Sequence, residues 1–163
     1  YINNFKTNIK WIIAPHDVSK NNIKRIKKNI NSNHLIYSDI NKDNVHSNIL
    51  ILNTIGHLKN IYKYADLSYV GGGMGNTGLH NILEACVFEI PVVVGKNYKK
   101  FNESIELVKL NGLISVKNQN EFDNEINKLI TNQKYRTEKI NNMRKYFNRQ
   151  TIATNSIIKN LSL

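Results

Sequence analysis

The stretch Asp66-Leu-Ser-Tyr-Val-Gly-Gly-Gly-Met-Gly-Asn-Thr-Gly-Leu-His-Asn-Ile-Leu-Glu84 decides the fold of this chain. It predicts a short buried strand over residues 67–70, a glycine-rich turn over residues 71–78, and a helix behind the turn. Asn76 or Thr77 is expected to cap this helix. Its apolar side would then carry Leu79, Ile82, Leu83 and Cys86.

The glycine-rich turn has the composition of a phosphate-binding loop. Five of its eight residues are glycine, so its backbone can adopt positive φ and approach a ligand without interference from a Cβ atom. The start of the predicted helix would add unpaired N–H groups and the positive end of a dipole. We therefore regard Gly72, Gly73, Gly78 and His80 as candidate phosphate contacts. The spacing matches neither the dinucleotide fingerprint nor the Walker loop, and a plain strand-to-helix turn is the alternative.

Glu84 is the strongest candidate for a specific ligand contact. It lies four residues after His80, so the two side chains would share one face of the predicted helix. A carboxylate at this place can accept two hydrogen bonds from vicinal hydroxyls, such as those of a ribose. The alternative is an acidic residue that the helix dipole favours near the helix start.

Apolar strands and amphipathic helices alternate along most of the chain. Strands are expected at about 10–14, 34–38, 49–52, 67–70, 91–95 and 113–116, and helices at about 19–30, 58–64, 101–110, 120–130, 134–148 and 151–161. This order predicts an α/β fold, a Rossmann-like parallel sheet with helices on both faces. Ligands bind such sheets at the carboxyl ends of the strands. Three polar or glycine-rich loops follow strands in this way and could converge on one crevice: 15–16, 54–56 and 71–78.

Composition narrows the classes of function. The 163 residues are 40% hydrophobic, enough for one domain with a real core. The net charge of +11 favours anionic partners, although the abundance of Asn, Ile and Lys equally indicates AT-rich coding drift. The lysines are scattered and no aromatic residues interleave with them, which argues against nucleic-acid binding.

The reactive residue types form no recognisable catalytic or metal site. Cys86 is the single cysteine and lies on the apolar side of the predicted helix, where a free cysteine packs as a small hydrophobe. The five histidines show no metal-ligand spacing, so no metal site is expected. His16 and His57 are each as well explained by a phosphate contact as by an exposed loop position. The chain therefore has the parts to bind a nucleotide and no obvious general base.

Five segments in one order resemble a known family. They are Ile12-Ile-Ala-Pro-His-Asp17, Asn53-Thr-Ile-Gly-His-Leu58, Ala65-Asp-Leu-Ser-Tyr-Val-Gly-Gly-Gly73, Gly78-Leu-His-Asn-Ile-Leu-Glu84 and Ile90-Pro-Val-Val-Val-Gly95. This series is similar to the C-terminal half of the 3-deoxy-D-manno-octulosonic acid (Kdo) transferases, which have the GT-B glycosyltransferase fold. The resemblance spans about residues 10–116.

The resemblance implies that this half binds CMP-Kdo as the donor substrate, with no cofactor and no tightly bound metal at the chemistry. The implied CMP contacts are Pro15 and His16 in the place of a Pro-Arg pair, Ile55, Gly56 and His57 in the place of a Met-Gly-Glu loop, and the block Asn81, Ile82, Leu83 and Glu84. Glu84 would hold the ribose. Three residues depart from the family pattern: His16 replaces an arginine, His57 replaces a glutamate, and Lys96 stands where proline is common.

The resemblance also implies a larger enzyme. It predicts that residues 1–163 are the nucleotide-sugar domain of a Kdo transferase, with residues 134–163 as C-terminal helices, and that they lack the N-terminal acceptor domain. That domain carries the family's catalytic base, so no catalytic residue is expected here and the segment alone should be inactive. The implied reaction transfers Kdo to a lipid A precursor, at the cytoplasmic face of the inner membrane and with peripheral attachment to it. The alternative is a stand-alone module that binds a nucleotide or phosphoryl ligand without catalysis.

Overall fold

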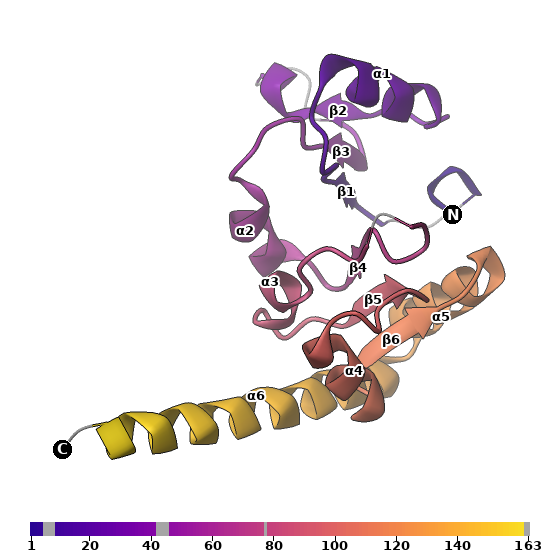
Figure 1. The fold of residues 1–163 in the computed structure, drawn as a ribbon. Coiled ribbons are helices and arrows are strands. Elements are labelled where there is room, and N and C mark those ends of the chain that lie inside the picture. The colour runs from indigo at the N-terminus through magenta and orange to yellow at the C-terminus, as the bar shows by residue number, and fades with distance from the viewer. Residues whose placement is uncertain (5–8, 42–45, 77, 162–163) are drawn as a thin grey trace. The chain divides into compact units, whose positions relative to one another are not determined.

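The computed structural model describes residues 1–4, 9–41, 46–76 and 78–161, without the side chains of residues 151–157, 160 and 161. The chain divides into two compact units, Tyr1–Ile61 and Tyr62–Leu163. We call them the N-terminal unit and the C-terminal unit. Each is described by itself (Figure 1).

The N-terminal unit is built around a three-stranded parallel sheet. Strand β3 lies in the middle and pairs with β1 on one side and with β2 on the other. The elements are η1 (Ile2–Asn4), β1 (Trp11–Ile13), α1 (Lys20–Lys28), β2 (Leu35–Ile36), η2 (Tyr37–Asp39), β3 (Ile49–Ile51) and α2 (Leu58–Ile61). The predicted strands and the first helix are confirmed, although β2 is shorter than predicted and ends in the turn η2.

Helix α1 begins where the sequence predicts. The Ser19 hydroxyl accepts a hydrogen bond from the Asn22 N–H, as an N-cap residue does. The helix then buries Ile23 against Ile36 of β2 and Ile51 of β3, which form the core of this unit. The polar side of α1 carries its lysines into solvent.

The C-terminal unit holds a second three-stranded parallel sheet, in the order β4-β5-β6. Its elements are η3 (Tyr62–Tyr64), β4 (Ser68–Val70), α3 (Leu83–Cys86), β5 (Val92–Gly95), α4 (Asn102–Lys109), β6 (Leu113–Val116), α5 (Gln119–Thr131) and α6 (Gln133–Leu161). Strand β6 packs against both α4 and α5, and α6 contacts the same two helices.

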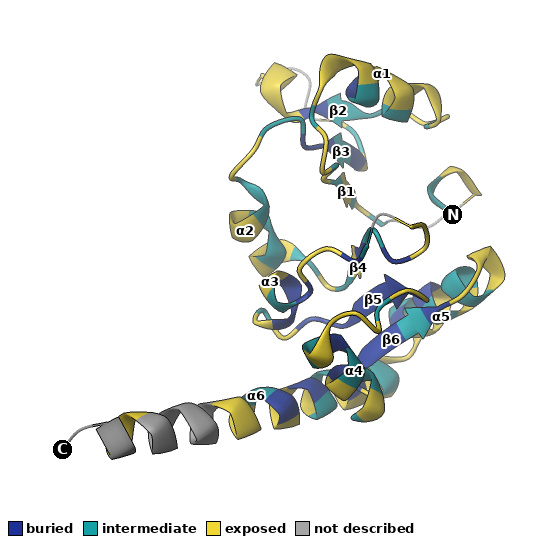
Figure 2. Cartoon of the chain, viewed as in Figure 1, coloured by how far each residue is buried: buried dark blue, intermediate teal, exposed yellow. Residues whose placement is uncertain are grey.

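Strand β5 lies at the centre of the larger hydrophobic core. All four of its residues are buried, and Val92, Val93 and Val94 have no exposed surface (Figure 2). A strand buried on both faces needs this continuous apolar sequence, because alternation would place polar side chains in the core. The other buried members of this core come from β4, the segment before α3, α3, α4, β6 and α6.

Helix α4 ends in a Schellman motif. Asn111 has a φ of 58°, its N–H bonds the Val108 carbonyl, and the Gly112 N–H bonds the Leu107 carbonyl. The sequence Asn111-Gly112 predicted this stop. The Asn111 side chain also accepts a hydrogen bond from Nζ of Lys139, which is only 4% exposed. The end of α4 is thereby tied to α6.

Two predictions about helices are wrong. The helix after the glycine turn covers only Leu83–Cys86 and does not start at the turn as predicted. Asn76 therefore does not cap it, and Thr77, the other predicted cap, lies outside the described residues. At the C-terminus one helix, α6, runs over Gln133–Leu161 where two were predicted. No proline or glycine occurs in that range, so no residue forces a break.

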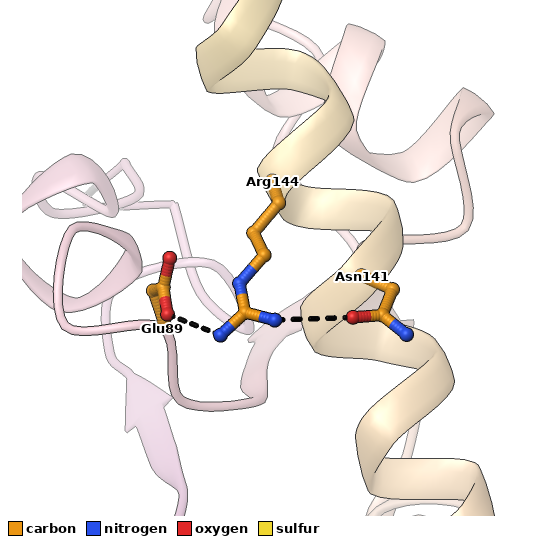
Figure 3. A network of polar contacts seen from close by, with 3 residues as sticks. All are labelled: Glu89, Asn141 and Arg144. Atoms are coloured by element: carbon orange, nitrogen blue, oxygen red, sulfur yellow. Dashed lines mark hydrogen bonds and ion pairs between the residues drawn. The ribbon is translucent and has the colours of Figure 1, made fainter.

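An ion pair joins α6 to the turn before β5 (Figure 3). Nη2 of Arg144 lies 2.5 Å from Oε2 of Glu89, and its Nη1 lies 3.2 Å from Oδ1 of Asn141. Glu89 has a φ of 56°, which a residue with a side chain rarely adopts. The pair therefore holds a strained turn at the surface of the C-terminal unit.

Candidate functional site

In the N-terminal unit, two of the predicted CMP-binding segments lie at one edge of the sheet. Strands β1 and β3 are parallel neighbours, with Ile13 opposite Ile51, and the Leu52 N–H donates to the Ile13 carbonyl over 2.8 Å. Pro15 and His16 follow β1, and the loop over residues 53–57 follows β3. Because the carboxyl ends of parallel strands meet at the same edge, both segments leave the sheet at that edge.

The loop after β3 exposes Ile55 and leaves space around Gly56. Ile55 is 83% exposed, and Gly56 has a φ of 91° with no atom near the place of a Cβ. The buried hydroxyl of Thr54 has no hydrogen-bond partner among the described residues. His57 is half-buried, with its ring centre 5.0 Å from that of Tyr37. An exposed apolar side chain beside a flexible glycine is suited to lie against a flat ligand.

The segment after β1 is fixed by a small polar cluster. The Ser19 N–H and hydroxyl donate to the two carboxylate oxygens of Asp17, over 2.8 and 2.9 Å. These bonds favour the charged carboxylate and hold the pKa of Asp17 below its usual value. His16, directly before it, is exposed. The imidazole therefore stands in solvent at the sheet edge beside a carboxylate that stays ionised.

In the C-terminal unit, the glycine loop between β4 and α3 closes on itself. The His80 N–H donates to the Gly71 carbonyl over 3.1 Å. Gly72 has a φ of 88°, and a Cβ at this place would lie 1.9 Å from the Gly78 carbonyl oxygen. Glycine at position 72 thus allows the close approach of the two sides of the loop, and glycine at position 78 allows a φ of 88°. The candidates Gly72, Gly73, Gly78 and His80 all belong to this one loop.

Asn97, just after β5, holds the glycine loop from outside. Its N–H donates to the Gly73 carbonyl and its Nδ2 donates to the Gly75 carbonyl, each over 2.8 Å. The backbones of Gly73 and Gly95 are in such close contact that a Cβ on Gly95 would lie 2.2 Å from the Gly73 carbonyl carbon. Our sequence reasoning assigned Asn97 no role. Its position two residues after a strand end was the available signal.

Glu84 lies in the first turn of α3 and is exposed, as a ribose contact must be. Nδ2 of Asn81 donates to its Oε1 over 3.1 Å, while Oδ1 of Asn81 accepts the Leu83 N–H over 3.0 Å. Asn81 thus orients the carboxylate and satisfies the start of the helix. Burial raises the pKa of the Tyr62 phenol, and the nearby charge of Glu84 raises it further.

The expected arrangement of the other residues in this block needs correction. His80 precedes α3 and does not share a helix face with Glu84, because its N–H bonds back to Gly71 and no helical turn forms there. With four residues, α3 also lacks the aligned dipole that the phosphate argument assumed. Ile82 is 2% exposed and Leu83 packs on the core. Only their backbone groups are left to contact a ligand.

The described residues show no reactive thiol, no metal-binding cluster and no membrane-spanning helix. Cys86 has no exposed surface, and burial raises the pKa of its thiol to about 12, so it packs as the predicted small hydrophobe. Among these residues no three metal-ligating side chains gather in one place. A search of the same residues finds no helix with the length and apolar character to cross a membrane.

Comparison with known proteins identifies glycosyltransferases, the class of enzyme that the resemblance implied. The family model of the glycosyl transferases group 1 matches residues 29–146. The fold is similar to the crystal structure of the C-terminal CMP-Kdo binding domain of WaaA from Acinetobacter baumannii, with a TM-score of 0.70 and 22% sequence identity over 82% of this chain and 71% of that chain. The predicted fold class, a Rossmann-like GT-B C-terminal domain, is thereby confirmed.

Three curated relatives also carry the names of transferases. A bifunctional glycosyltransferase/methyltransferase of Fusobacterium nucleatum is 28% identical over 96% of this chain and 24% of its own length. A 3-deoxy-D-manno-octulosonic acid transferase of Aquifex aeolicus is 30% identical over 55% of this chain and 26% of its own length, and one of Haemophilus influenzae is 32% identical over 45% and 17%. The resemblance read from the sequence is confirmed. The chain spans about a quarter or less of the length of these relatives.

Proposed function

Because the chain belongs to the glycosyl transferases of group 1, we propose that it forms the CMP-binding half of a Kdo transferase. The observation that carries this proposal is the double likeness to Kdo transferases in sequence and to a CMP-Kdo binding domain in fold. The relatives' names supply the substrate class. The residues of this chain supply the contacts.

The candidate contacts with CMP are taken unit by unit. In the N-terminal unit they are Pro15 and His16 after β1 and Ile55, Gly56 and His57 after β3, with the exposed Ile55 suited to lie against a flat base. In the C-terminal unit, Glu84 would accept hydrogen bonds from the two ribose hydroxyls while Asn81 orients it. The glycine loop would take the phosphate through its backbone.

The whole enzyme would transfer Kdo from CMP-Kdo to a lipid A precursor, with no cofactor. The site for the acceptor and the catalytic base would lie in an N-terminal domain. The enzyme would attach peripherally to the cytoplasmic face of the inner membrane. The net charge of +11 is compatible with an anionic lipid surface. A stand-alone binding module is less favoured, because the relatives that share this sequence are transferases.

Calorimetric titration tests the donor site. We expect the full-length protein to bind CMP in preference to UMP, AMP and GMP, and Glu84→Ala to weaken CMP binding at least tenfold because the ribose loses its acceptor. Glu106→Ala is the matched control, since Glu106 is an exposed carboxylate on α4 outside the proposed contacts. Equal affinity for all four nucleotides, or full affinity in Glu84→Ala, would contradict the assignment.

A further inference from the structure

The loop between β5 and α4 carries an unneutralised cluster of positive charge. It contains Lys96, Lys99 and Lys100, and all three are exposed. Within the part of the chain that the structure describes, no carboxylate pairs with any of them. The segment from Gly95 to Asn102 has no acidic residue, and neither has the glycine loop over residues 71–80. We call residues 96–100 the lysine loop.

The lysine loop stands on a fixed backbone. Asn97 bonds the carbonyls of Gly73 and Gly75, Tyr98 packs against the hydrophobic core, and the Phe101 N–H closes a turn onto the Tyr98 carbonyl over 3.2 Å. Its first residue, Lys96, directly follows the last residue of β5. The loop is therefore anchored next to the glycine loop at the carboxyl edge of the sheet, where ligands bind parallel sheets.

The glycine loop has no lysine or arginine. The helix behind it is too short to add a useful dipole. An anion held there needs a compensating charge, because an unpaired charge that leaves water is costly. The lysine loop is fastened to it by both hydrogen bonds of Asn97. The backbone that carries the three lysines is thus fixed next to the glycine loop.

We infer that the lysine loop is the oxyanion subsite of the donor site, with Asn97 as the positioning residue that fixes it against the glycine loop. This inference rests on the proposed function and specifies which residues would recognise the charged end of the donor. A sugar-acid donor on a nucleotide offers two such groups, the phosphate and the sugar carboxylate. Both are oxyanions that an ammonium binds as a point charge.

The experiment compares three ligands on the full-length protein: cytidine, CMP and CMP-Kdo. The gain in affinity from cytidine to CMP measures the phosphate, and the gain from CMP to CMP-Kdo measures the sugar. A triple variant with Lys96, Lys99 and Lys100 each changed to Gln should lose at least tenfold in one of these two gains. The step that shrinks identifies which oxyanion the lysines bind. Cytidine affinity should stay within threefold.

The control is a triple variant with Lys24, Lys27 and Lys28 changed to Gln, which removes the same charge from the exposed face of α1. It should leave both gains unchanged. Asn97→Ala should reduce the same gain as the lysine variant while all three lysines remain. Asn97→Asp would lose the side-chain donor and place a negative charge beside the lysines, so its loss should be larger.

The outcomes separate this inference from the proposed function. If the wild type binds CMP no better than UMP, AMP or GMP, the proposed function fails. If the wild type selects CMP but both lysine variants behave alike, or neither gain changes, the lysine loop is no oxyanion subsite and the inference is overturned. Loss of cytidine affinity in the lysine-loop variant would overturn it too, because cytidine has no anion.

Discussion

The two units hold their candidate loops in different ways. In the N-terminal unit, the loop over residues 53–57 presents Ile55 at 83% exposure and Gly56 with open space around it. In the C-terminal unit, the glycine loop is closed by His80 and clamped by Asn97. One loop has room to adjust to a ligand and the other is already fixed.

The hydrophobic clusters of the two units also differ in size, and the larger one belongs to the unit with the fixed loop. In the N-terminal unit one buried cluster joins three isoleucines of α1, β2 and β3, whereas the C-terminal unit has a larger cluster around the fully buried strand β5. A loop on a large, rigid core can keep a phosphate-sized site in shape, since its geometry is fixed by packing. We therefore expect the loop of the N-terminal unit to adjust to a ligand more than the glycine loop does.

The strongest way to break this contrast is Gly95→Ala. A Cβ here would meet three backbone atoms of Gly73 and Met74 within 2.5 Å, and backbone atoms cannot move aside as side chains can. We expect a loss of about 4 kcal/mol or more in the free energy of unfolding. Gly75→Ala is the control, because nothing lies within 4 Å of its Cβ position. Urea denaturation measures both, and equal stability of the two variants would show that the loop is not packed as described.

Asn111→Ala should produce the next largest effect. Alanine is strained at a φ of 58°, and the buried ammonium of Lys139 loses its acceptor. Together these effects should cost about 2 to 3 kcal/mol. Asn111→Gly keeps the backbone conformation and loses only the side chain, so it should cost less. If the two variants lost the same stability in thermal unfolding, the strain argument would be wrong.

Raising the pH should weaken the C-terminal unit through Cys86. Burial raises the pKa of this thiol to about 12, well above its ordinary value, so the unfolded chain ionises first. Its contribution to stability is complete below about pH 9 and is lost progressively as the pH rises towards 12. Between pH 7 and pH 10 the loss should be about 1 kcal/mol. Cys86→Ala should show a flatter dependence on pH in the same denaturation series, and an unchanged slope would contradict this account.

Arg144→Ala should have the smallest effect. The Glu89–Arg144 pair is about half exposed on both sides, and water screens such surface pairs so that they contribute little to stability. Glu89→Gly removes the same pair but relieves the strain of a φ of 56°. We expect Glu89→Gly to be at least as stable as Arg144→Ala in thermal unfolding. A lower stability of Glu89→Gly would mean that the φ of 56° at Glu89 carries no strain, because both variants lack the ion pair.

The sequence predicted the elements whose signals are local. The strands and Ser19 as the cap of α1 follow from apolar runs and capping chemistry, and the stop of α4 follows from Asn111-Gly112. The start of α3 could not be predicted in this way. His80 bonds back to Gly71 and Ile82 turns into the core, and both contacts depend on the loop closing in three dimensions.

The same limit applies to the candidate site. Motif order indicated Glu84, and the structure shows it exposed, as a ribose contact must be. The partners that orient the site were not visible from spacing alone. Asn97 reaches the glycine loop across 22 residues of sequence to Gly75, and the Tyr37 ring lies beside His57 from another strand end. Such contacts arise from sheet register, which the sequence determines only through the whole fold.

A transfer assay on the full-length protein tests the central claim most directly. CMP-Kdo labelled in the Kdo group and a lipid A precursor are incubated with the wild type, Glu84→Ala and Glu106→Ala. The account predicts labelled lipid with the wild type and Glu106→Ala, and at least a tenfold slower transfer with Glu84→Ala. Failure of the folded wild type to transfer Kdo, or an undiminished rate in Glu84→Ala, would contradict it.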